Sequence, residues 1–245
     1  MDGFLESGSF QMTKHRRFWG WTAGFLVLLL GGGAPLAAQT ELLHEDVLQL
    51  DLWLPIAPIP EGGLTQPKVE KAAPQKLLKE ARWLISGMIF GWKVVYVPSD
   101  TARQVAEILE VKPQGEIPWG DPGLQVTKTW SDFDNNRFYA SFLFTLTSAE
   151  KDLRSRWAAV ELQTAGGRGE WVGTDTVEGR QKAFDQAVKA SLRNALRPEV
   201  YNKPARIEAE ILLLHPPLFG SAGGRIFCTA DFRYFLTLVR PYAAY

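Results

Sequence analysis

Alternating acidic and amide residues in the stretch TWSDFDNNRF are the first candidates for a chemical role. Asp132, Asp134 and Asn136 occupy every second position, like the first ligands of a calcium-binding loop. Such a loop also needs a glycine at its sixth position and a glutamate at its twelfth, where this chain has Arg137 and Leu143. We therefore favour the turn of a β-hairpin over a metal site, because Asp and Asn stabilise tight turns through side-chain hydrogen bonds.

Two carboxylates in the loop GEIPWGDPG could perform acid–base chemistry. Glu116 and Asp121 flank Trp119, and a pair of carboxylates beside an aromatic side chain suits glycoside hydrolysis. Gly, Pro and Asp also favour tight turns, so we expect a turn here, with Trp119 packed on the core. A glycan hydrolase that uses Glu116 and Asp121 is the alternative interpretation.

Residues for nucleophilic or metal chemistry are scarce in the rest of the chain. Between residues 39 and 245 the chain has two histidines, His44 and His215, and a single cysteine, Cys228. The cysteine falls on the apolar face of an alternating segment, so we expect a buried thiol. No motif for a zinc, phosphate or nucleotide site occurs in the sequence. The sequence therefore predicts no cofactor and no enzymatic activity.

Aromatic residues are the more suggestive feature, since the chain has nine tryptophans. Tryptophan and tyrosine combine a large apolar area with a polar atom and are enriched at protein interfaces. We expect some of them to form a partner-binding or ligand-binding surface, and the candidates are Trp53, Trp83, Trp119, Trp130 and Tyr139. In an alternative, glycan-binding function, Trp119, Trp130 and Tyr139 would be the surfaces on which sugars stack.

Charge and the N-terminal segment indicate where the protein works. The chain has 27 basic and 27 acidic residues, and this neutral balance argues against a nucleic-acid partner. Basic residues at 14–17 precede an apolar run, Phe18 to Leu30, that is shorter than the about 20 residues of a membrane span. We expect a secretory signal peptide over 1–38, with cleavage after Ala38 and a possible start at Met12. The protein is thus predicted to be periplasmic or extracellular, with a retained anchor as the alternative.

Hydrophobic periodicity predicts an α+β fold with mostly antiparallel strands, a meander, a C-terminal hairpin and about three helices packed on one face. Strands are expected over residues 44–55, 92–98, 124–130, 138–146, 153–163, 205–215 and 225–239. Helices are expected over residues 74–91, 99–113 and 175–198. For 153–163 a helix is the alternative, because Thr147 and Glu150 could form a capping box.

A proline-rich linker over 55–73 separates an N-terminal strand within 39–54 from a single domain over 74–245. A strand on such a tether could complete the sheet of a neighbouring protein. We therefore expect a non-enzymatic protein of the cell envelope, such as a structural subunit of a coat, sheath or scaffold. Its partner would be another envelope protein or a second copy of the same chain.

Overall fold

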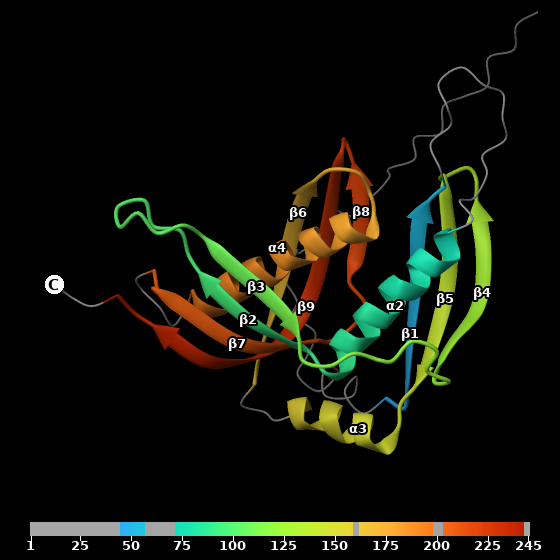
Figure 1. The fold of residues 1–245 in the computed structure, drawn as a ribbon, viewed down its shortest axis with the longest axis horizontal. Coiled ribbons are helices and arrows are strands. Elements are labelled where there is room, and N and C mark those ends of the chain that lie inside the picture. Colours follow the sequence, from blue (N-terminus) through green and yellow to red (C-terminus); the bar gives the residue numbers. More distant parts are fainter. Residues whose placement is uncertain (1–44, 57–71, 159–161, 198–202, 243–245) are drawn as a thin grey trace, which may run out of the picture. The chain divides into compact units, whose positions relative to one another are not determined.

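The described residues form two antiparallel sheets and three α-helices, and Figure 1 shows their arrangement. The described residues of this computed structural model are 45–56, 72–158, 162–197 and 203–242. The expected signal peptide, its cleavage site and the start at Met12 lie outside them, as does most of the proline-rich linker. The predicted α+β class with mostly antiparallel strands is confirmed.

The first sheet has three antiparallel strands in the order β1–β5–β4. These are β1 (Val47–Pro55), β4 (Leu124–Asp132) and β5 (Arg137–Thr145). Alternate leucines of β1, from Leu48 to Leu54, are buried, because successive side chains of a strand point to opposite faces. β1 pairs with β5 over all nine of its residues, so it belongs to the core of its own chain and is not a detached segment.

The second sheet has six strands in the order β3–β2–β7–β9–β6, with β8 also paired to β9. They are β2 (Trp92–Val97), β3 (Ile108–Pro113), β6 (Gln163–Val172), β7 (Arg206–Leu213), β8 (Leu218–Ala222) and β9 (Arg225–Arg240). The first part of β9 pairs with β6 and β8, and its second part pairs with β7. β8 meets β9 through Gly223 and Gly224, whose φ angles of 57° and 72° suit a tight hairpin turn.

Two long helices cover the apolar faces of the sheets. α2 (Ala73–Ile89) contacts β1 and β5 of the first sheet and β7 of the second, and α4 (Val177–Leu196) packs on β6 and β9. The approach of α4 to β6 requires glycine, because a Cβ on Gly169 would lie 2.0 Å from the carbonyl oxygen of Ala183. Buried side chains of both sheets and both helices form one continuous hydrophobic cluster.

The strand expected over 153–163 is wrong, because the chain forms the helix α3 (Ser148–Ser155) and a 3₁₀ turn, Arg156–Ala158. The hydroxyl of Thr147 accepts from the backbone N–H of Glu150, and the Glu150 carboxylate accepts from the N–H of Thr147 at 2.8 Å. This capping box satisfies the first donors of the helix and outweighs the weak alternation of the sequence.

The helix expected over 99–113 is also wrong, because this segment forms a turn followed by β3. The Asp100 carboxylate accepts from the N–H of Arg103 at 3.2 Å, as an N-cap would. The chain then reverses at Gln104, whose φ is 55°, and Asp100 pairs with Val105 in an isolated bridge. β3 finds its hydrogen-bond partners along β2, so tertiary pairing overrides the local helical pattern. β8 was not among the expected strands either.

Candidate functional site

The register of the three-stranded sheet brings three of the predicted aromatic residues into one row. Tyr139 lies directly opposite Trp53 on one side and directly opposite Trp130 on the other. All three belong to the face opposite the buried leucines of β1, and each is half-buried. The rings of Trp130 and Tyr139 are stacked, with centroids 4.9 Å apart and planes inclined by only 2°.

Two cationic side chains lie over rings of this row. The guanidinium of Arg137 lies 3.9 Å from the ring centroid of Trp53, and its Nη1 donates to the Tyr139 hydroxyl at 3.4 Å. Lys128 Nζ lies 5.0 Å from the centroid of Trp130. We call Lys128, Trp130, Tyr139, Arg137 and Trp53 the cation–aromatic row. Sequence analysis missed both cations, although their even spacing from Trp130 and Tyr139 places them on the same face of their strands.

The inner end of the row is anchored by a buried charge cluster. Arg180 of α4 lies 4.4 Å from the ring centroid of Trp53 and donates through Nε to Asp175 at 2.7 Å. Its Nη1 also lies 3.3 Å from a carboxylate oxygen of Glu80 on α2. Burial disfavours the charged form of Glu80 more strongly than Arg180 favours it, which raises the pKa of Glu80 to about 7. Because the three side chains are at most 7 % exposed, this cluster holds the fold and does not meet a substrate.

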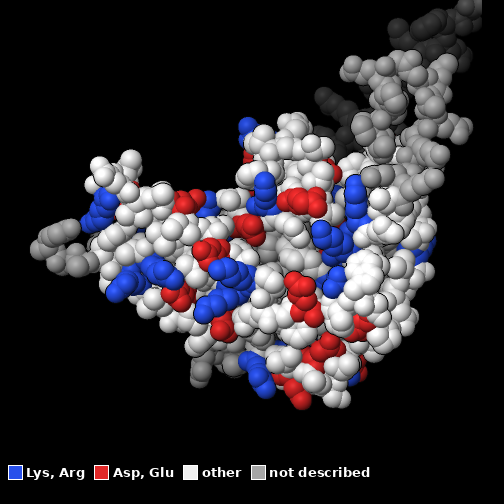
Figure 2. Space-filling view, viewed as in Figure 1, with Lys and Arg blue, Asp and Glu red and all other residues white. Residues whose placement is uncertain are grey.

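The arrangement of the row decides what it can bind. Trp130 and Tyr139 cover one face of each other's ring, and cations lie over the rings of Trp130 and Trp53, which leaves less ring surface free for stacking on a sugar. Ring edges and cationic donors remain at the surface, and Trp, Tyr and Arg are the types that dominate binding energy at protein interfaces. Acidic and basic groups are interspersed over the face of the molecule seen in Figure 2.

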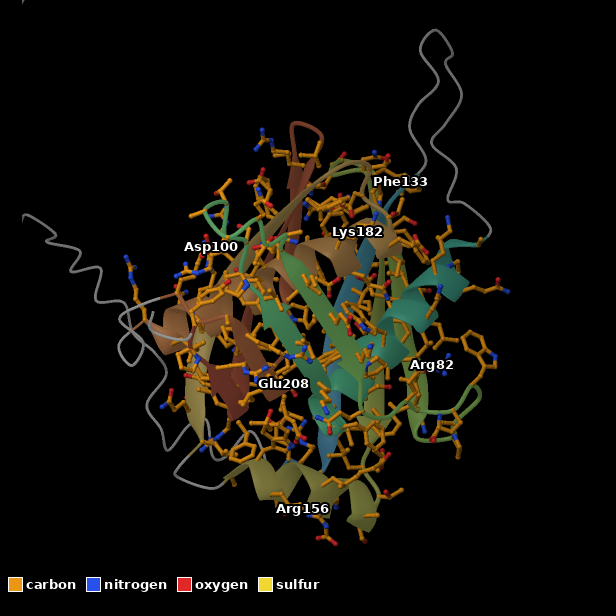
Figure 3. All side chains as sticks on the ribbon, turned by 60° about the vertical axis from the view of Figure 1, so that its left-hand side comes forward. Arg82, Asp100, Phe133, Arg156, Lys182 and Glu208 are labelled. Atoms are coloured by element: carbon orange, nitrogen blue, oxygen red, sulfur yellow. The ribbon has the colours of Figure 1, made fainter. Side chains whose placement is uncertain are left out.

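The other predicted aromatic residues lie elsewhere. Trp83 is half-buried and packs against the core, with its ring centroid 4.9 Å from that of Phe184 and 6.0 Å from that of Trp92. Trp119 was expected on the core but is 61 % exposed, with the guanidinium of Arg82 5.0 Å from its centroid. Arg82 projects from α2, as labelled in Figure 3.

The carboxylates of the GEIPWGDPG loop have different surroundings. Asp121 accepts from the N–H of Gly123 at 2.8 Å and so stabilises a turn, as expected. Glu116 lines a small cavity beside α2, and Asp121 is not part of the lining. The structure therefore gives the two carboxylates separate roles and does not assemble them on one cavity.

The stretch that suggested a metal loop is the turn of the β4–β5 hairpin, as predicted. Asp132 accepts from the backbone N–H of Asn135 at 3.0 Å and from its side-chain amide at 2.7 Å. These hydrogen bonds lower the pKa of Asp132. Asn136 takes the left-handed conformation, with φ of 53°, and Phe133 projects at the tip of the turn (Figure 3). Asp134 is exposed, and no group of three or more metal-ligating side chains occurs within the described residues.

The reactive residue types have ordinary surroundings. Cys228 is fully buried, as expected, and burial raises the pKa of its thiol to about 12. His215 Nε2 lies 3.0 Å from Asp231 on the surface, and His44 is outside the described residues.

None of the helices that the structure describes is both long enough and apolar enough to cross a membrane.

Fold and site together define an α+β protein with a cation–aromatic surface on its smaller sheet. A protein-family model matches residues 37–242, so the chain belongs to that family, which is uncharacterised. The chain is also similar to an uncharacterized protein of Treponema pallidum (strain Nichols), with 22% identity over 228 residues that cover 90% of this chain and 95% of that protein. No solved structure matches the chain.

Proposed function

We propose that this protein is an exported, non-enzymatic component of the cell envelope that contacts another protein through the outer face of its three-stranded sheet. The proposed export rests on the sequence of residues 1–38. The proposed contact rests on one observation, the cation–aromatic row. The partner is another envelope protein or a second copy of this chain, in an assembly such as a coat or sheath.

The row supports a protein contact because of its composition and its stiffness. Trp53, Trp130, Tyr139 and Arg137 belong to the three residue types that most often carry binding energy at interfaces. Their mutual stacking and the hydrogen bond from Arg137 to Tyr139 fix the side chains before a partner arrives. A preorganised surface loses less conformational entropy on binding than a flexible one does.

Side-chain contact fits the structure better than strand donation. β1 already pairs with β5 of its own chain along its whole length, so it is not a free strand that could complete a neighbour's sheet. The free edge of β4 carries a bulge between Val126 and Lys128, and both a bulge and an edge lysine hinder the addition of a strand. The proposed contact therefore uses the face of the sheet and not the edge formed by β4.

The test is recovery of the partner from cells after crosslinking. A photo-crosslinking residue at Gln125, which is exposed and precedes the row on β4, should capture a defined partner or a ladder of self-crosslinks. Trp130→Ala and Arg137→Ala should each reduce capture by about tenfold or more, since interface hot spots contribute at least about 2 kcal/mol.

Trp171→Ala is the matched control, because Trp171 is another half-buried tryptophan with a cation, Lys182, 4.4 Å from its ring centroid. It lies on β6 of the other sheet and should leave capture unchanged. Equal losses for the Trp130 and Trp171 variants, or full capture with both row variants, would refute the proposed contact.

A further inference from the structure

A small cavity of about 140 Å³ lies between α2, α4 and the loop that follows β3. Its first wall is one stripe of α2, whose lining residues recur at helical spacing: Lys79, Arg82, Trp83, Ser86 and Gly87. Its second wall is formed by Trp92, Pro113, Glu116 and Gln181. Two tryptophans and several polar groups thus face the same space.

The polar side chains of this cavity have unused hydrogen-bonding capacity. The side chains of Glu116 and Gln181 make no hydrogen bond within the part of the chain that the structure describes. Arg82 donates through Nε and Nη2 to the carbonyl of Ile117, at 3.1 and 2.6 Å, and its Nη1 has no partner among the described residues. A carboxylate that only accepts, an amide that does both and a guanidinium that only donates therefore line one cavity.

Trp119 stands beside this cavity on a loop that α2 holds in place. Besides the two bonds from Arg82, the hydroxyl of Ser86 accepts from the N–H of Ile117 at 2.9 Å. Arg82 is the shared element, because it lines the cavity and also lies 5.0 Å from the ring centroid of Trp119. The indole is 61 % exposed, so most of its surface is open to solvent. The hydrogen bonds of the loop with Arg82 and Ser86 hold the loop that carries it in place.

We propose that Trp119 and this cavity form a carbohydrate-binding site. The C–H groups of one sugar ring pack on the exposed indole, and its hydroxyl groups bond to Glu116, Gln181 and Arg82. A sugar hydroxyl both donates and accepts, so it needs donor and acceptor side chains close together, and the lining supplies both. The cavity is smaller than the roughly 300–1,000 Å³ of pockets for drug-sized ligands, which fits a single sugar unit of a glycan.

This site is independent of the proposed protein contact. The three rings of the row are half-buried and two of them stack on each other, whereas Trp119 is 61 % exposed and has one cation, Arg82, over its ring. The glycan-binding alternative from the sequence used Trp119, Trp130 and Tyr139, and the site proposed here combines Trp119 with Glu116. Variants of the two sites should separate the two functions.

The test measures binding of maltotriose, cellotriose and tri-N-acetylchitotriose to the full-length protein, by tryptophan fluorescence and by titration calorimetry. At least one of these sugars should bind with a Kd of about 0.1–1 mM, as expected for a small exposed site. Trp119→Ala should weaken that binding by about tenfold, the typical effect of one aromatic contact. Glu116→Gln, a conservative change at an exposed position, should weaken it while the unfolding transition stays unchanged.

Trp130→Ala is the control, because it should disturb partner capture and leave sugar binding intact. Sugar binding that survives Trp119→Ala, or no saturable signal from any of the three sugars up to about 10 mM, would overturn the proposal. Equal displacement of the sugar by sodium phosphate would also overturn it, since the site would then be a simple anion site formed by Arg82 and Lys79.

Discussion

The buried cluster of Glu80, Arg180 and Asp175 leads to a quantitative prediction about pH. Burial raises the pKa of Glu80 from 4.5 to about 7, so the folded protein holds a proton on this carboxyl that the unfolded chain has already released. The stabilisation that comes from protonated Glu80 is fully present below pH 4.5 and is lost as pH rises through 7. The free energy of unfolding should therefore fall with pH across this window.

The magnitude follows from the size of the pKa shift. Each pKa unit corresponds to about 1.4 kcal/mol, so the ionised form of Glu80 makes the fold less stable than the protonated form by up to about 3 kcal/mol. Glu80→Gln imitates the protonated carboxyl and leaves Arg180 paired with Asp175 at 2.7 Å. The variant should therefore be more stable than the parent protein by about 1 kcal/mol at pH 5 and by about 3 kcal/mol at pH 8.

The assay is urea unfolding of the parent and Glu80→Gln proteins at a series of pH values, followed by tryptophan fluorescence. The informative quantity is the difference between the two curves, because burial also raises the pKa of Asp185, to about 6, and both proteins share that contribution. A constant difference between pH 5 and pH 8, or a variant less stable than the parent at pH 8, would refute the reasoning. In that case attraction to Arg180 outweighs the cost of burial.

Three further predictions follow from the packing. Arg180→Met should destabilise the fold by about 3–5 kcal/mol in urea unfolding, because it leaves Glu80 and Asp175 buried without their cation; the loss should shrink at low pH, where Glu80 is protonated. Gly169→Ala should cost about 1–3 kcal/mol, since its Cβ would collide with α4, whereas Gly220→Ala, with nothing within 4 Å, should change stability by less than about 0.5 kcal/mol. Cys228 should react with thiol reagents only at the rate at which the protein unfolds, and fast labelling in native buffer would show that its burial is incomplete.

Elements with strong local patterns could be predicted from the sequence. The alternating leucines of β1 and the long apolar stripe of α4 placed a strand and a helix within a few residues of their observed bounds. The segments 99–113 and 153–163 failed because their outcome depends on partners. β3 forms because β2 lies beside it and supplies its hydrogen-bond partners. The segment 153–163 has only a weak alternation of apolar and polar residues, and the capping box at Thr147 favours a helix there.

The candidate site was only partly accessible to sequence reasoning. The aromatic residues were chosen correctly by type, but the row exists only because β1 pairs with β5, which lies far along the chain. The buried cluster was missed because Glu80 and Arg180 are 100 residues apart, and a charged helix residue is ordinarily solvated. No pattern in the sequence indicated that Trp119 is exposed, because loops lack the periodicity that distinguishes inner from outer side chains.

The position of β9 has a consequence for how the protein is made. β6 and β8 pair with no strand other than β9 among the described residues, and β7 is joined to them only through it. Of the strands within residues 163–222, β7 can pair with β2, which precedes it in the chain, whereas β6 and β8 have no described partner until β9 follows. The three-stranded sheet and the β3–β2–β7 part of the larger sheet can pair earlier, but the larger sheet is complete only after residues 225–240 have been synthesised. Until then β6 and β8 leave their strand edges unpaired, and unpaired edges of this kind are surfaces that chaperones protect.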